Sequence, residues 1–107
     1  MTVEKEYEGD ATILKVDGDL AGVNAQELRV KATESLNAGN VDFLVDLADS
    51  PGCDSQGLEA LTWLCGESQE RLGIVQLREV GETFRKILQI TRLGELFEHD
   101  ESTSDEC

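Results

Sequence analysis

Several residue types are scarce in this sequence, and each scarcity argues against a class of protein. No apolar run approaches the roughly 20 residues that cross a bilayer, and the first ten residues contain no signal-peptide core. The three cysteines, Cys53, Cys65 and Cys107, form no C-x-x-C pair, so we expect reduced thiols and no zinc site. We therefore expect a cytoplasmic protein with no direct membrane insertion, no metal and no other cofactor.

Basic residues are also scarce. Nine Lys and Arg stand against 23 Asp and Glu, which gives a formal net charge of −14. Proteins that bind nucleic acid or anionic membranes need clustered cations, so neither is expected as a partner, whereas a basic protein surface is compatible. Acidic residues are dense near the end of the chain, and we expect one domain over residues 1–98 and an acidic, disordered tail over 99–107.

Catalytic motifs are missing as well. The one histidine, His99, lies in the acidic tail, and there is no G-x-S-x-G sequence, which argues against a Ser-His-Asp hydrolase. No glycine-rich phosphate loop precedes a helical pattern, so tight nucleotide binding is not expected either. The prediction is a protein that is not an enzyme.

The hydrophobic pattern predicts an α/β domain with the order β-β-α-β-α-β-α-β. Its mixed sheet would begin with an N-terminal hairpin, and three main helices would cover at least one side. The expected strands are 3–7, 11–16, 41–47, 74–77 and 96–97, and the expected helices are 24–38, 55–72 and 82–94. Continuous apolar residues predict that the third strand is buried on both faces and that the fourth is buried too.

Capping signals set the expected helix ends. Asn24, followed by Glu27, has the pattern of a capping box at the start of the first helix, and Gly39 has the pattern of its C′ residue. The expected inward positions are Leu28, Ala32, Ser35 and Leu36 in the first helix, Leu58, Leu61, Cys65 and Leu72 in the second, and Phe84, Ile87, Leu88 and Thr91 in the third.

The most informative stretch is 41–64. A buried strand leads into a loop rich in Asp, Ser, Pro and Gly, and the loop ends in Asp54-Ser55-Gln56-Gly57, where a helix begins. A serine there can carry a phosphate, because free backbone N–H groups and the helix dipole favour an anion. The competing interpretation is that Ser55 or Asp54 is only a helix cap. Ser50 is a second candidate acceptor, although a turn residue explains it better, and a nucleophilic Ser55 in an enzyme is a third, weaker interpretation.

The order of these elements resembles the STAS domain, the family that includes the bacterial anti-sigma factor antagonists. Val16-Asp17-Gly18-Asp19-Leu20 resembles the family's strand ending in Gly-x-Leu, and Asp54-Ser55-Gln56-Gly57-Leu58 is similar to its Asp-Ser-Ser/Ala-Gly-Leu signature. Segments 24–36, 43–47 and 84–97 resemble its first helix, the strand before its active loop, and its closing helix and strand.

The resemblance implies that Ser55 is phosphorylated by a partner serine kinase that is also an anti-sigma factor. Unphosphorylated protein would bind this kinase and free a sigma factor, and phosphorylation would reverse the binding. The implied contact residues are Asp19, Asp54, Ser55, Gln56 and Gly57. Pro51-Gly52-Cys53 and Gln56 depart from the family pattern, which keeps open an alternative: a non-phosphorylated accessory subunit of a larger complex, such as a phospholipid transporter.

Overall fold

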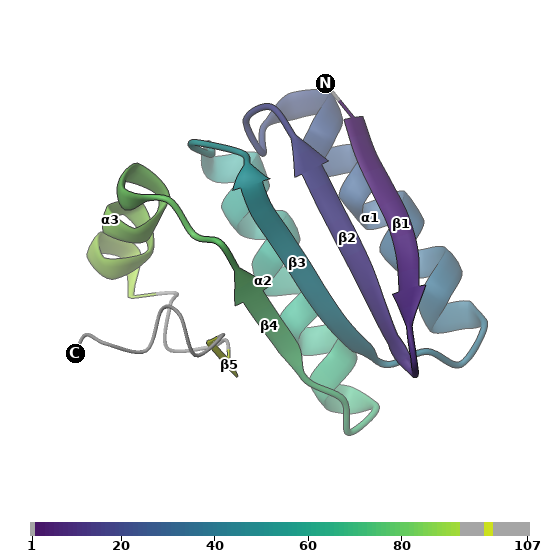
Figure 1. The fold of residues 1–107 in the computed structure, drawn as a ribbon. Helices are drawn as coiled ribbons and strands as arrows, with labels where there is room; N and C mark the ends of the chain where they lie inside the picture. Colours follow the sequence, from purple (N-terminus) through teal and green to yellow (C-terminus); the bar gives the residue numbers. More distant parts are fainter. Residues whose placement is uncertain (1, 93–97, 100–107) are drawn as a thin grey trace.

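The computed structural model describes residues 2–92 and 98–99. Five strands and three helices alternate in the expected order (Figure 1). The strands are β1 (Thr2–Glu8), β2 (Ala11–Asp17), β3 (Asp42–Asp49), β4 (Val75–Arg78) and β5 (Glu98–His99); the helices are α1 (Gly22–Asn37), α2 (Ser55–Glu70) and α3 (Glu82–Thr91). The α/β class, the mixed sheet and the three main helices are therefore confirmed.

The sheet has the strand order β1-β2-β3-β4-β5. β1 and β2 form the antiparallel N-terminal hairpin, and every later pair is parallel. The crossovers through α1 and α2 step in the same direction across the sheet, and these two helices lie side by side on one face (Figure 1). Among the strands of residues 2–92 and 98–99, the order across the sheet follows the order along the chain without a reversal. The sheet therefore lacks the reversal point at which open α/β sheets usually form a ligand crevice.

The core lies between the sheet and these two helices. It is mainly aliphatic and includes Leu14, Val45, Leu47, Leu61 and Leu77. β3 alternates between buried and half-buried residues, so the prediction that it is buried on both faces was wrong; one face packs on the helices and the other has no helix over it. The predicted fourth strand, 74–77, is buried only in part. Ile74 lies before β4 and is exposed, and within β4 buried and half-buried residues alternate.

The start of α1 corrects the capping-box prediction. The N-cap residue is Ala21, and Asn24 is buried inside the first turn. Glu27 does not cap the helix either: its carboxylate accepts hydrogen bonds from the Val3 amide (2.9 Å) and the Thr2 hydroxyl (3.4 Å) of β1. Neither side chain caps α1: Asn24 donates to the loop just before the helix, and Glu27 accepts from the distant strand β1.

The other helix ends agree only in part. Gly39 follows α1 with φ +94°, and the Asn40 amide donates to the Ser35 carbonyl, as expected for a C′ glycine. α2 ends at Glu70, and Leu72, expected to be inward, is 94% exposed with a left-handed backbone. In α3, Phe84 and Leu88 are buried as expected, whereas Thr91 is exposed.

The C-terminal predictions are tested only at two residues. α3 ends at Thr91, and the expected stop at Gly94 and the expected strand 96–97 lie outside the described residues. β5 pairs with β4 and takes in His99, the first residue assigned to the tail. The division at residue 98 stays a prediction. None of the helices in the described ranges combines the length and apolar character needed to cross a membrane.

Candidate functional site

Two loops at the same end of the sheet are joined into one platform. The β2–α1 loop meets the β3–α2 loop through a parallel bridge between Leu20 and Cys53. The Leu20 amide donates to the Gly52 carbonyl (2.9 Å), and the Asp54 amide donates to the Leu20 carbonyl (3.4 Å). The bridge places Asp19 beside the segment that leads into α2. The sequence could not show this, because the two loops are more than 30 residues apart.

The buried side chain of Asn24 holds the β2–α1 loop in place. Its side-chain amide donates to the backbone carbonyls of Asp17 (3.0 Å) and Asp19 (2.8 Å), and the residue is fully buried. A buried amide that satisfies two loop carbonyls holds them in one conformation. The Asn24–Glu27 capping-box pattern predicted an N-cap, but the Asn24 side chain instead supports the neighbouring loop.

Gly57 explains how closely the loops approach α2. It is buried, and a Cβ atom at this position would lie 1.9 Å from the Leu20 carbonyl oxygen. Only glycine permits this contact between the first turn of α2 and the β2–α1 loop. Gly57 therefore shapes the site without presenting a side chain at its surface.

Asp54, and not Ser55, caps α2. The Asp54 carboxylate accepts a hydrogen bond from the Gly57 amide at 3.0 Å, in the manner of an N-cap residue. Ser55 is the first helical residue, its side chain is exposed, and within the described part of the chain its hydroxyl makes no hydrogen bond. Ser50 is buried, and its hydroxyl points to the Gly52 carbonyl (3.5 Å). Of the two candidate acceptors, only Ser55 is accessible.

The Cys53 thiol, two residues before Ser55, is partly buried and feels two nearby carboxylates. Burial, with smaller contributions from the carboxylates of Asp54 and Asp19, raises the pKa of Cys53 to about 11. The carboxylates of Asp54 and Asp19 therefore both lie within electrostatic range of the Cys53 thiol. Asp19, Asp54 and Gln56 are all exposed, so the predicted contact residues other than Gly57 share one accessible surface.

This arrangement predicts slow alkylation of Cys53. In a Cys107→Ser background, iodoacetamide should label Cys53 at pH 9 about fifty-fold more slowly than an unperturbed thiol, because only the thiolate reacts. Asp19→Asn should lower the pKa of Cys53 and speed its labelling, whereas Asp10→Asn, an exposed change in the β1–β2 turn, should not. Equal rates in the two variants, measured by peptide mass spectrometry, would show that Asp19 is not close to the thiol.

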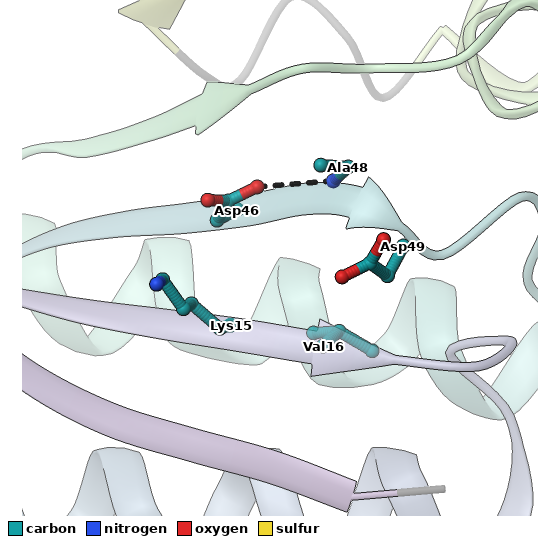
Figure 2. A pocket seen from close by; sticks show the side chains of 5 residues that line it. All are labelled: Lys15, Val16, Asp46, Ala48 and Asp49. Carbon is teal, nitrogen blue, oxygen red and sulfur yellow. Dashed lines mark hydrogen bonds between the residues drawn. The ribbon is translucent and has the colours of Figure 1, made fainter.

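A shallow hollow on the uncovered face of the sheet is a separate feature (Figure 2). It is lined by Lys15, Val16, Asp46, Ala48 and Asp49, where the β2–β3 register shifts by one residue. One Asp46 oxygen accepts from the Ala48 amide and the other from Arg78, both at 3.0 Å, so this carboxylate is already engaged. Among residues 2–92 and 98–99, no three His, Cys, Asp or Glu side chains are grouped to hold a metal ion.

The fold and the platform define a small α/β domain that presents one exposed serine at a helix start. Comparison with protein families gives a match to the STAS domain over residues 2–107. The chain belongs to the STAS domain family. No curated protein matched the sequence.

Solved structures with the same fold come from two settings. An anti-sigma factor antagonist of Thermotoga maritima is 20% identical, with a TM-score of 0.85 and coverage of 97% of this chain and 92% of the other. The phosphorylated form of the Bacillus cell fate determinant SpoIIAA is 17% identical, with a TM-score of 0.69 and 95% coverage of each chain. A sulfate transporter family protein of Wolinella succinogenes is 18% identical, with a TM-score of 0.75, and coverage is 88% of this chain and 76% of the other. At these identities the similarity concerns the fold.

Proposed function

We propose that this protein is an anti-sigma factor antagonist that is switched by phosphorylation of Ser55. In its unphosphorylated form it binds a serine-kinase anti-sigma factor and thereby frees a sigma factor; in its phosphorylated form it releases the kinase. The observation that carries the proposal is that Asp54 and Ser55 have different positions at the start of α2. Asp54 caps the helix, which leaves the exposed Ser55 hydroxyl available to a partner enzyme.

The platform explains why a phosphate would act locally. Leu20, Asn24 and Gly57 hold the two loops together by contacts that do not involve the Ser55 side chain. A phosphate adds about −1.5 to −2 charges at neutral pH, beside the carboxylates of Asp54 and Asp19. The N–H groups of the first turn of α2 and the helix dipole favour an anion there, so the fold would survive the modification.

Release of the partner follows from the cost of burying charge. A neutral serine can enter a protein interface at little expense. A phosphoserine in the same interface must lose its hydration, and the adjacent carboxylates repel it instead of compensating it. The switch therefore needs no large conformational change, only a surface that becomes unfavourable to cover.

Phosphate mapping tests the proposal directly. After incubation with the cognate kinase and ATP, the peptide that contains Ser55 should gain one phosphate, and Ser55→Ala should abolish the incorporation. Ser102→Ala, a change in the acidic tail, is the matched control and should leave it intact. Phosphate on another residue, or undiminished incorporation into Ser55→Ala, would contradict the proposal.

The transporter-family neighbour favours one second candidate, an accessory subunit of a larger complex that needs no phosphorylation. The unusual Pro51-Gly52-Cys53 sequence in the β3–α2 loop is compatible with a different partner there. Purification of the native complex separates the two candidates. A co-purifying membrane ATPase would favour the subunit, and a co-purifying serine kinase would favour the antagonist.

A further inference from the structure

α3 is the basic element of an acidic protein. Its residues and the adjoining Arg92 include three of the nine basic side chains, Arg85, Lys86 and Arg92, against one carboxylate, Glu82. All three cations are exposed. In the chain as a whole acidic residues outnumber basic ones by 14, so a local excess of positive charge is the exception on this surface.

These cations are not used inside the described domain. Ion pairs within it engage Lys5, Lys15, Arg71 and Arg78, and Arg29 lies over the Trp63 ring. Among the residues that the structure describes, none pairs through a carboxylate with Arg85, Lys86 or Arg92; Arg85 makes only a long hydrogen bond to the Val80 carbonyl (3.4 Å). The α3 surface therefore offers positive charge to a further acidic group.

We infer that the acidic segment 100–107 of the same chain docks on this face of α3. The segment contains four carboxylates, Asp100, Glu101, Asp105 and Glu106, and no basic residue. Its charge is complementary to that of α3, and a tethered segment competes at an effective concentration that reaches the millimolar range. Weak surface ion pairs that would not hold a separate peptide can hold a tethered one.

β5, the element that precedes the segment, lies beside the strand that leads into α3. β5 runs parallel to β4, and His99 lies beside Leu77. β4 in turn leads into α3, which begins four residues after Arg78 (Figure 1). Eight residues span up to about 26 Å when extended, longer than the ~15 Å axis of a ten-residue helix. The segment is therefore longer than the helix on which we infer that it docks.

A spin label on Cys107 of the full chain tests this docking. Cys65 is buried and Cys53 has a raised pKa, and a Cys53→Ser background removes the remaining ambiguity. At low salt the label should broaden the amide NMR signals of residues 85–92 more than those of α1. About 0.5 M salt, at which the Debye length falls below 5 Å, should restore them. Lys86→Glu with Arg92→Glu should restore them as well.

Two controls decide between docking sites. Neutralising the four tail carboxylates as Asn or Gln should abolish the broadening, whereas neutralising the exposed Glu4, Glu8, Asp10 and Glu70 in the same way should leave it unchanged. Broadening spread evenly over the domain, or centred elsewhere, would overturn the inference. So would broadening that appears only between separate molecules in a mixture of spin-labelled and isotope-labelled protein, because that result would assign the tail to a second copy.

Discussion

Ser55→Asp is expected to weaken binding to the kinase partner on the order of 100-fold, equivalent to about 3 kcal/mol. The substitution places a permanent negative charge beside Asp54 on a surface that the partner must cover, and like charges brought together in an interface cost several kcal/mol. The variant should fold normally, because an aspartate in the first turn of a helix interacts favourably with its dipole. Titration calorimetry against the purified kinase measures the effect.

Ser55→Asn is the matched control for this prediction. Asparagine has nearly the same size as aspartate but no charge, so it separates the electrostatic effect from a steric one. We expect a loss of affinity of less than tenfold for Ser55→Asn. Equal losses in both variants would show that shape and not charge governs release, and unimpaired binding of Ser55→Asp would refute the proposed switch.

Gly57→Ala is expected to lower the free energy of unfolding by about 3 kcal/mol, at the upper end of the cost of overpacking. The added methyl group would lie 1.9 Å from the Leu20 carbonyl oxygen and 2.9 Å from its carbon. Leu20 is fully buried, and hydrogen bonds to Gly52 and Asp54 hold its backbone, so it cannot move away without separating the two loops. Urea unfolding followed by circular dichroism gives the change.

Gly66→Ala tests whether the effect of Gly57→Ala belongs to that one contact. Gly66 lies in the same helix, is exposed, and has no heavy atom within 4 Å of the position that an added Cβ would take. Alanine should stabilise α2 there by about 0.5–1 kcal/mol, because glycine is the poorer helix former. If both alanine variants stabilise the protein, the close approach of Leu20 to α2 is not present in solution.

The parts of the fold that follow from local pattern were predictable. The element order, the C′ glycine of α1 and the inward residues of α1 depend on periodicity and on short-range capping rules. The failures occur where contacts outside the helix itself, or the point at which the helix ends, decide the structure. Asn24 and Glu27 have the pattern of a local capping box, but each bonds to backbone groups of another element. Leu72 continues the apolar pattern of α2, but the helix ends two residues before it.

In the candidate site too, residues that are adjacent in the sequence were predicted, and contacts between separate segments were not. Asp54, Ser55 and Gln56 are consecutive, so a single motif identified them. The approach of Asp19 was expected only through family resemblance, and the structure gives the physical cause in the Leu20–Cys53 bridge. Asn24 supports the platform through its buried side-chain amide, and Gly57 through its close approach to the Leu20 carbonyl. Neither contact can be predicted from the hydrophobic periodicity of the sequence.

The contact between Glu27 and β1 has a consequence for how other chains can associate with the domain. The Val3 amide points away from β2 at the outer margin of the sheet, where an added strand would need it, and the Glu27 carboxylate already accepts its hydrogen bond. Lys5, two residues further along the same strand, is tied to Glu34 at 3.0 Å. Strand addition along β1 would have to break the Val3–Glu27 hydrogen bond and accommodate the charged Lys5, so this edge is protected against β-augmentation and edge-to-edge aggregation.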